Sequence, residues 1–325
     1  MENQPFENRI DLTELRQAVT QIKEEIGKVI VGQSQMVELL IAALLADGHV
    51  LIEGVPGVAK TLTAKILARI VSVDFSRIQF TPDLMPSDVL GTSVFNTKKS
   101  EFEFRQGPIF SNLILIDEIN RSPAKTQAAL FEVMEEKQIT FDGTTYPMEK
   151  PFLVLATQNP IDQEGTYRLP EAQLDRFLFK IQVNYPSLED EAVILARAHG
   201  RQSLLPLEEI KPILSAAELE SYRDKIKAIH IDQELLRYIA RIVNQTRTHN
   251  ALYLGASPRA SLAIMNGSKA LAAMQGRDFV MPDDIQAVVA PVLRHRILLT
   301  PEKEMEGTHV DAVIKQIVDS VEVPR

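Results

Sequence analysis

The amino-acid sequence predicts an α/β protein with a doubly wound parallel sheet, followed by a C-terminal region built only of helices. Short apolar runs of strand length alternate with helical patterns through residues 1–185, and this alternation is typical of a parallel sheet with crossover helices. The patterns in residues 186–325 are helical. The strands that we expect in the sheet are 50–52, 75–80, 113–116, 152–156 and 177–183.

Length and composition are those of an ordinary globular protein with room for two domains. The chain has 325 residues, of which 45% are hydrophobic and 24% are charged, so it can bury a sizeable core. A net charge of −9 argues against a protein that binds nucleic acid over its whole surface. The chain has no cysteine, which excludes disulfides and thiolate sites. We find no signal peptide, and the longest early apolar run, 39–46, is far too short to span a membrane, so we expect a cytoplasmic location.

Two segments interrupt the alternation of strands and helices. Residues 81–110 are expected to be irregular, apart from an alternating stretch at 101–105 that suggests a hairpin strand. The dipeptide Asp142-Gly143, which lies between alternating residues, predicts a second hairpin. A segment as long as 81–110 inside a compact α/β domain is usually functional.

The C-terminal region contains helices with clear ends. One is expected at 258–275, because Ser257 is a good N-cap and Gly276 follows its last turn. Another is expected near 282–293. The basic cluster at 294–296 is interpreted as a solvated end of that helix, where cations are favoured by the dipole.

Residues 49–61, HVLIEGVPGVAKT, predict a phosphate-binding loop between the first strand and a helix. Gly54, Lys60 and Thr61 fall in register with the template G-x-x-x-x-G-K-[ST], and Ala59 occupies the position of the second glycine. Backbone N–H groups of such a loop converge on phosphate oxygens at the N-terminus of the helix. Lys60 would reach the terminal phosphates, and the hydroxyl of Thr61 would be a ligand of Mg²⁺.

The loop taken alone leaves an alternative open, which is a flexible turn with a solvated lysine. Because alanine disfavours positive φ, we expect Ala59 to hold a helical conformation at the start of the following helix. The residues that would contact ATP are Gly54, Val55, Pro56, Gly57, Val58, Ala59, Lys60 and Thr61.

A second strand end supplies two acids. The apolar run 113–116 is followed directly by Asp117 and Glu118, and ligands of open α/β sheets bind at the C-terminal ends of the strands. We expect Asp117 to hold Mg²⁺ through water, opposite Thr61, and Glu118 to polarise the attacking water. The alternative is a strand end with solvated acids, and the phosphate-binding loop upstream makes it the weaker interpretation.

Four segments, GVPGVAKT, LILIDEINRSP, LVLATQNP and EGTYRLPEAQLDRFLFK, together closely resemble the MoxR family of AAA+ ATPases. The resemblance runs over most of the chain. It implies an AAA+ nucleotide-binding core at 1–185 and an α-helical lid domain at 186–325. Within the core it implies a helix-2 insertion at about 81–110 and a pre-sensor-1 hairpin at about 138–149, and it places residues 31–33 near the adenine.

The resemblance also implies roles for individual residues of the core. Residues 54–61 would be the Walker A loop, and Asp117 and Glu118 would be the Walker B pair. Asn159 would be the sensor-1 residue, which helps to position the attacking water.

Arginines complete the site that the resemblance implies. Arg176 would be the arginine finger offered to the ATP of the adjacent subunit, and Arg121 and Arg168 compete for this role in trans. Arg259 lies in the first turn of the helix expected at 258–275, where the dipole disfavours a cation and an anion is therefore expected nearby. The segment GASPRA matches the sensor-2 motif, which would bring Arg259 to the ATP phosphates. For Arg176 and Arg259 the alternative is a surface ion pair.

The functional prediction is a cytoplasmic, Mg²⁺-dependent ATPase that hydrolyses ATP at the subunit interfaces of a ring, expected to be a hexamer. The resemblance suggests chaperone-like remodelling or maturation of protein partners, such as complex assembly or the insertion of metals or cofactors. Such proteins often act alongside a protein with a von Willebrand factor A domain. The alternatives are a magnesium-chelatase-like motor subunit, a monomeric P-loop kinase, a nearly inactive nucleotide-dependent scaffold, and a nucleic-acid motor, which the acidic charge disfavours.

Overall fold

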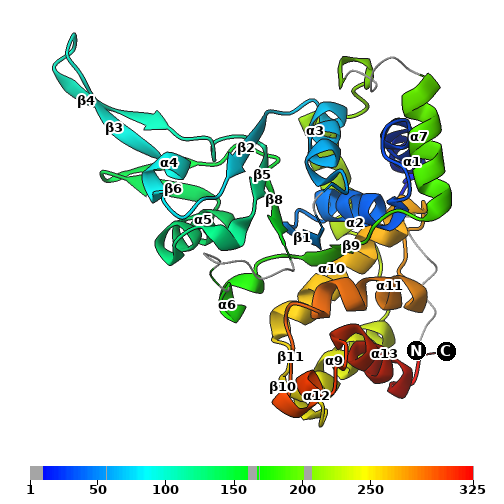
Figure 1. Cartoon of the computed structure of the whole chain (residues 1–325). Helices are drawn as coiled ribbons and strands as arrows, with labels where there is room; N and C mark the ends of the chain where they lie inside the picture. The colour runs from blue at the N-terminus through cyan, green and yellow to red at the C-terminus, as the bar shows by residue number, and fades with distance from the viewer. Residues whose placement is uncertain (1–9, 56, 160–166, 168, 201–206, 325) are drawn as a thin grey trace. The chain divides into compact units, whose positions relative to one another are not determined.

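The computed structural model describes residues 10–55, 57–159, 167, 169–200 and 207–324 (Figure 1). It confirms the α/β class, with a parallel sheet and helices in the first part of the chain and helices in the last part. The chain divides into two compact units, and each is described by itself. The core unit comprises residues 22–40 and 47–220, and the helical unit comprises residues 1–21, 41–46 and 221–325. The domain boundary after residue 185 stays a prediction.

A five-stranded sheet of order β2-β5-β8-β1-β9 lies in the core unit, and all its strand pairs are parallel. Its strands are β1 (Val50–Gly54), β2 (Phe75–Gln79), β5 (Leu113–Asp117), β8 (Leu153–Gln158) and β9 (Phe179–Val183). The five strands expected from the sequence are confirmed. Strand β1 lies between β8 and β9, whereas β2, the next strand along the chain, lies at the far edge of the sheet. The strand order therefore switches at β1, and ligands of such sheets bind at the switch point.

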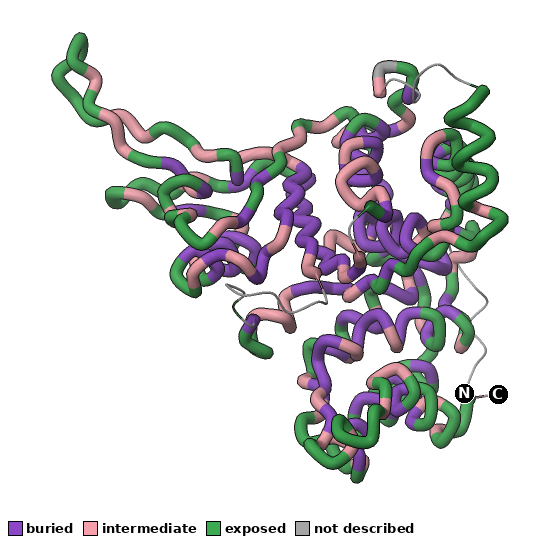
Figure 2. The backbone as a smooth tube through the Cα atoms, in the orientation of Figure 1, coloured by how far each residue is buried: buried purple, intermediate pink, exposed green. Residues whose placement is uncertain are grey.

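The apolar runs form strands because the sheet is buried. Residues 113–116 of β5 are at most 1% exposed, and the central strands β5 and β8 are mostly purple in Figure 2, whereas the edge strand β2 is only partly buried. Helix α3 (Lys60–Val71), which follows β1, also buries an apolar face that includes Ile66, Leu67 and Ile70. Burial stabilises the fold by about 1.5–3 kcal/mol for each such side chain.

Other helices that lie entirely in the core unit include α5 (Ala124–Glu136), α6 (Glu171–Leu174) and α7 (Leu188–Gly200). Single 3-10 turns lie at Ile119–Arg121 and Leu207–Glu209. Three helices contribute residues to both units, namely α1 (Thr13–Gly27), α2 (Ser34–Leu45) and α8 (Ala216–Lys227). No helix within the described ranges combines the length and the apolar character that crossing a membrane requires.

The segment at 81–110 is more regular than the sequence indicated. It contains α4 (Pro86–Leu90) and an antiparallel hairpin of β3 (Gly91–Asn96) and β4 (Glu101–Gln106). The expectation of an irregular segment was therefore wrong except for the strand at 101–105. Figure 1 shows this hairpin projecting away from the five-stranded sheet.

The second hairpin is confirmed. Its strands are β6 (Gln138–Phe141) and β7 (Thr144–Pro147), and the two turn residues between them, Asp142 and Gly143, both have positive φ, of 48° and 74°. This is the conformation that an Asp-Gly turn adopts easily. The two hairpins meet through aromatic rings, because Phe104 of β4 lies 4.8 Å from the ring centroids of both Phe141 and Tyr146.

The helical unit contains α9 (Gln233–Thr248), α10 (Pro258–Met274), α11 (Pro282–Leu293), α12 (Pro301–Met305) and α13 (Val310–Ser320), with a small sheet of β10 (Leu252–Leu254) and β11 (Leu298–Leu299). The capping prediction for α10 is confirmed. The hydroxyl of Ser257 accepts a hydrogen bond from the N–H of Arg259, and Gly276 beyond the last turn has a φ of 77°. The helix expected near 282–293 is α11.

The basic cluster after α11 is not solvated, so that expectation was wrong. His295 and Arg296 are only 6% and 8% exposed. Arg296 donates from Nη1 to the carbonyl of Val292 at 2.6 Å, and Arg294 pairs with Asp311 of α13 at 2.9 Å. Helix α13 packs against α11 and supplies the partner of Arg294, while Arg296 binds a carbonyl near the end of the helix from a buried position.

Candidate functional site

The loop after β1 has the backbone of a tight strand-to-helix turn. Gly54 ends β1, Gly57 has a φ of 89°, and Lys60 begins α3. A Cβ atom on Gly54 would approach the carbonyl oxygen of Val183 to 2.6 Å, so no larger residue fits there. Among the predicted nucleotide-binding residues, Pro56 lies outside the described residues.

 The backbone of Ala59 is left-handed, with φ 60° and ψ 21°. Ala59 is the residue that caps α3, and the sequence led us to expect the conformation of a right-handed helix there, so that expectation was wrong. The chain needs a left-handed residue to turn from the loop into α3, which is the reason for the glycine of the template. An alanine in this conformation costs about 1–2 kcal/mol.

A cavity of about 450 Å³ brings most of the predicted site residues of the core unit together at the C-terminal ends of the strands, but Val55, Val58 and Arg176 are not among the residues that line it. Its lining residues are Gly54, Gly57, Ala59, Lys60, Thr61, Leu62, Arg77, Gln79, Asp117, Glu118, Thr157 and Asn159. The loop after β1, the acids after β5 and the polar end of β8 thus face one space. This is the arrangement that the sequence predicted for the phosphate-binding loop and the acid pair.

The hydroxyl of Thr157 makes hydrogen bonds to both acids. Asp117 is 7% exposed, and its Oδ1 accepts a hydrogen bond from the hydroxyl of Thr157 at 3.2 Å. The same hydroxyl oxygen accepts from the N–H of Glu118 at 3.0 Å. Glu118 itself has a φ of 57°, an uncommon conformation that turns the chain from β5 into the 3-10 turn at Ile119–Arg121. Thr157 therefore ties β8 to both acids.

Two further polar residues of the cavity were not found by the sequence analysis. Arg77 donates from Nε to Oδ2 of Asp117 at 2.6 Å, and Gln79 donates from Nε2 to Oε2 of Glu118 at 3.0 Å. Both lie on β2, two residues apart and therefore on one face of the strand. The sequence carries that alternation, but it does not reveal that β2 pairs with β5, with Gln79 in register with Asp117.

Lys60 lies among carboxylates in a half-buried position. Its Nζ donates to the carbonyl of Gly54 at 2.5 Å. Burial lowers the pKa of Lys60 below its ordinary value, while the charges of Asp117, Glu118 and Glu53 oppose this effect. A lysine whose charge is partly desolvated in this way is well placed to gain from an anionic ligand.

Two of the arginines predicted to act in trans, Arg121 and Arg176, form ion pairs within their own chain. Arg121 pairs with Glu118 at 3.2 Å. Arg176 follows α6 and donates from Nε to Oε2 of Glu135 at 2.8 Å, with its guanidinium 6.0 Å from the ring centroid of Phe131. Arg176 thus takes part in an ion pair within its own chain.

Two other predicted arginines cannot be placed beside this cavity. Arg168 lies outside the described residues. Arg259 lies in the first turn of α10, in the helical unit, and its backbone N–H donates a hydrogen bond to the hydroxyl oxygen of Ser257. Its contact with phosphate stays a prediction.

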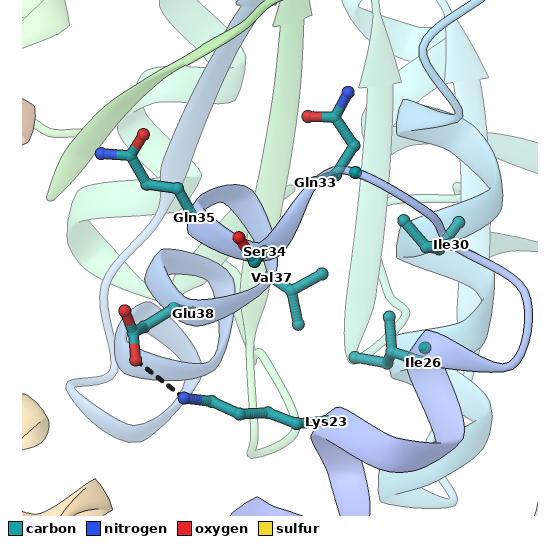
Figure 3. Close-up of a pocket in the computed structure, with 10 residues that line it drawn as sticks. Lys23, Ile26, Ile30, Gln33, Ser34, Gln35, Val37 and Glu38 are labelled. Atoms are coloured by element: carbon teal, nitrogen blue, oxygen red, sulfur yellow. Dashed lines mark hydrogen bonds and ion pairs between the residues drawn. The ribbon is translucent and has the colours of Figure 1, made fainter. Parts of the chain in front are cut away.

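A second cavity, of about 350 Å³, lies between the end of α1 and the start of α2 (Figure 3). Apolar side chains, including Ile26, Ile30 and Val37, line it, and Lys23 and Glu38 form an ion pair of 2.7 Å beside it. Residues 32 and 33 contribute to its lining, but the placement of adenine near 31–33 stays a prediction. Within the described residues, no group of three or more acidic, histidine or cysteine side chains is arranged to hold a metal ion.

The fold and the cavity define a P-loop ATPase of the AAA class, and comparison with known proteins agrees. Residues 49–179 match the model of the "ATPase family associated with various cellular activities (AAA)", and residues 244–317 match the model of the AAA lid domain. A crystal structure of a candidate ATPase from Cytophaga hutchinsonii superposes with a TM-score of 0.88 at 43% identity, covering 96% of this chain and 97% of that one.

Two curated relatives narrow the class to a family. The chaperone MoxR1 of Mycobacterium tuberculosis is 46% identical over 93% of this chain and 81% of its own length. The uncharacterized protein YeaC of Bacillus subtilis is 46% identical over 93% of each chain. The chain therefore belongs to the MoxR family of AAA+ ATPases, and it is an ATPase.

Proposed function

We propose that this protein uses Mg²⁺-dependent ATP hydrolysis, carried out at the subunit interfaces of a ring, to remodel or mature partner proteins. The observation that carries the proposal is the cavity of the core unit, in which the phosphate-binding loop, Asp117 and Glu118 line one space. A P-loop ATPase requires these groups in one place, because its catalysis consists of positioning and charge stabilisation.

The residues of the cavity suit a magnesium nucleotide. Thr61 and Asp117 both line it and provide the hydroxyl and carboxylate oxygens that Mg²⁺ prefers. Bound Mg²⁺ would neutralise charge that develops on the phosphates. The backbone N–H groups at residues 57–61 would bind phosphate oxygens at the N-terminus of α3, and Lys60 would place its ammonium group beside the terminal phosphates.

The chemical step is assigned to Glu118 and Asn159. Glu118 would polarise a water molecule for in-line attack on the γ-phosphorus, and the amide of Asn159 would help to position that water. Both residues line the cavity, and the Thr157 hydroxyl and the Gln79 amide hold Glu118 at its backbone and its carboxylate, respectively. A carboxylate that is oriented in advance loses less entropy when the reaction takes place.

Assembly is the second part of the proposal. We assign Arg176 as the arginine finger that acts on the ATP of a neighbouring subunit in a hexameric ring, with Arg121 and Arg168 as the other candidates. Arg259 would reach the phosphates from the lid domain, for which we propose residues 186–325. Support for the ring comes from membership of the AAA+ class, whose active sites are composite.

The third part concerns the client. The relative named chaperone MoxR1 supports chaperone-like action, and we extend this proposal to complex assembly or the insertion of a metal or cofactor. A protein with a von Willebrand factor A domain is the partner we would seek first, in the cytoplasm. The negative net charge of the chain gives no reason to expect nucleic acid as the substrate.

The test is steady-state ATPase activity measured against protein concentration. We expect activity per subunit to rise with concentration, and to be lost in Glu118→Gln and in Arg176→Ala. A mixture of the two variants should recover part of the activity, because some interfaces then combine an intact Glu118 with an intact Arg176. Activity that is independent of concentration and survives Arg176→Ala would refute the ring mechanism.

A further inference from the structure

The contact between Arg77 and Asp117 places a cation on the carboxylate to which the proposed function assigns Mg²⁺. Nε of Arg77 lies 2.6 Å from Oδ2 of Asp117, which is the short distance of a charge-assisted hydrogen bond. The other oxygen of Asp117 accepts from the hydroxyl of Thr157. Both carboxylate oxygens therefore already have donors within the chain.

The two partners of this pair differ in their freedom to move. The side chain of Asp117 is 10% exposed, whereas the side chain of Arg77 is 49% exposed. The backbone of Arg77 is fixed in β2, where it is in register with Leu115 of β5. Arg77 can therefore leave Asp117 by rotating its side chain into water, without any movement of the strand.

Mg²⁺ and the guanidinium group make opposing demands on the same oxygen. Mg²⁺ held by Asp117, directly or through water, would need lone pairs of a carboxylate whose two oxygens already accept from Arg77 and Thr157, and two cations close together also repel one another. Lys60 adds a third positive charge near enough to interact with Asp117. The carboxylate carries a single negative charge, so it cannot balance all of these cations at once.

We propose that Arg77 competes with Mg²⁺ for Asp117 and thereby raises the Mg²⁺ concentration at which the nucleotide site becomes loaded. This inference rests on the proposed function, because it takes Asp117 as the acid that holds the ion. Arg77 is a positioning residue under this proposal: it acts through Asp117, and it releases that residue when the ion arrives.

The test measures binding, not turnover. The full chain is titrated with Mg²⁺ in the presence of a fluorescent ADP analogue, starting from a solution that contains EDTA, and the half-saturating Mg²⁺ concentration is read from the fluorescence. We expect Arg77→Gln to lower this concentration by about three- to tenfold, the range set by the loss of one partly exposed ion pair. Arg77→Lys, which keeps the charge but loses the planar donor group, should lie between wild type and Arg77→Gln.

Arg105→Gln is the matched control. It removes the same charge from an exposed arginine of β4 in the core unit, which does not line the nucleotide cavity. We expect it to shift the half-saturating Mg²⁺ concentration by less than about twofold, in line with an exposed charge that is not in direct contact with the ion's ligand. A shift as large as that of Arg77→Gln would mean a general effect of net charge and would overturn the proposal.

The double variant Arg77→Gln with Asp117→Asn tests whether the effect passes through Asp117. In the Asp117→Asn background, Arg77→Gln should leave the half-saturating Mg²⁺ concentration unchanged, since there is no carboxylate left to contest. An unchanged or higher half-saturating concentration in Arg77→Gln alone would also overturn the competition. Thermal unfolding is measured for each variant, and Arg77→Lys carries the comparison if Arg77→Gln does not fold.

Failure of the proposed function gives a different result. If the site does not bind a magnesium nucleotide, wild type itself shows no Mg²⁺-dependent binding of the ADP analogue. If the site binds it but Arg77 does not compete, wild type saturates with Mg²⁺ and Arg77→Gln follows the same curve.

Discussion

Replacing Ala59 by glycine should stabilise the core unit, although glycine usually destabilises a protein. Ala59 has a φ of 60°, and its Cβ costs about 1–2 kcal/mol in this left-handed conformation. Glycine removes that cost but makes the unfolded chain more flexible, which takes back about 0.4–1 kcal/mol. The net expectation is a gain of about 0.5–1 kcal/mol in the free energy of unfolding.

The assay is thermal unfolding of the full chain, without nucleotide, followed by circular dichroism. A gain of this size should raise the unfolding temperature by about 1–4 °C in domains of this size. Ala128→Gly provides the matched control, because Ala128 is exposed in the right-handed helix α5 of the same unit. There we expect a loss of about 1 kcal/mol.

The two substitutions are chemically identical, so the sign of their effects isolates the backbone conformation. The reasoning is refuted if Ala59→Gly lowers the unfolding temperature as Ala128→Gly does. That result would mean that Ala59 is not held with positive φ in solution, and the loop would then need another geometry to bind phosphate.

Three other predictions concern contacts away from the nucleotide cavity. Glu135→Gln removes the ion-pair partner of Arg176. It should lower the free energy of unfolding by less than about 1 kcal/mol, because the pair is partly exposed, and ATPase assays should show that activity is retained. A loss of activity equal to that of Arg176→Ala would assign the pair itself to catalysis. Nδ1 of His49 accepts a hydrogen bond from the backbone N–H of Val154 in β8, and its Nε2 lies 3.2 Å from the carbonyl oxygen of Met134. His49→Ala leaves these buried groups without partners, so it should lower the free energy of unfolding by about 2–4 kcal/mol in urea titrations. A loss under about 1 kcal/mol would contradict this. Phe104→Ala should speed hydrogen exchange in both hairpins, because its ring joins them, while Phe102→Ala, in a side chain that is 71% exposed, should leave the β6–β7 hairpin unchanged.

Local sequence was sufficient wherever a feature depends on neighbours in the chain. The apolar run at 113–116 followed by two acids predicted β5 and the position of Asp117 and Glu118 at its end. Ser257 and Gly276 predicted the ends of α10. The resemblance to the MoxR family, carried by four segments of the chain, agrees with the comparisons.

Sequence was insufficient where a feature depends on contacts between distant segments. The basic cluster at 294–296 looks solvated in the sequence, but Arg296 is buried and Arg294 pairs with Asp311 of α13, a contact that only the packing of α13 on α11 provides. Segment 81–110 shows a clear pattern only at 101–105, yet β3 also forms and pairs with β4 in a hairpin, and Phe104 of this hairpin contacts rings of the second hairpin.

The nucleotide cavity divides in the same way. The sequence by itself determined the class of protein, the position of the loop between β1 and α3, and the acids that follow β5, because each depends on a short run of residues; the left-handed backbone of Ala59 was not foreseen. Only the tertiary structure decided that Arg77 and Gln79 bind those acids, since the contact requires β2 to lie beside β5. Strand order is set by the packing of the whole sheet, and no short segment of the chain encodes it.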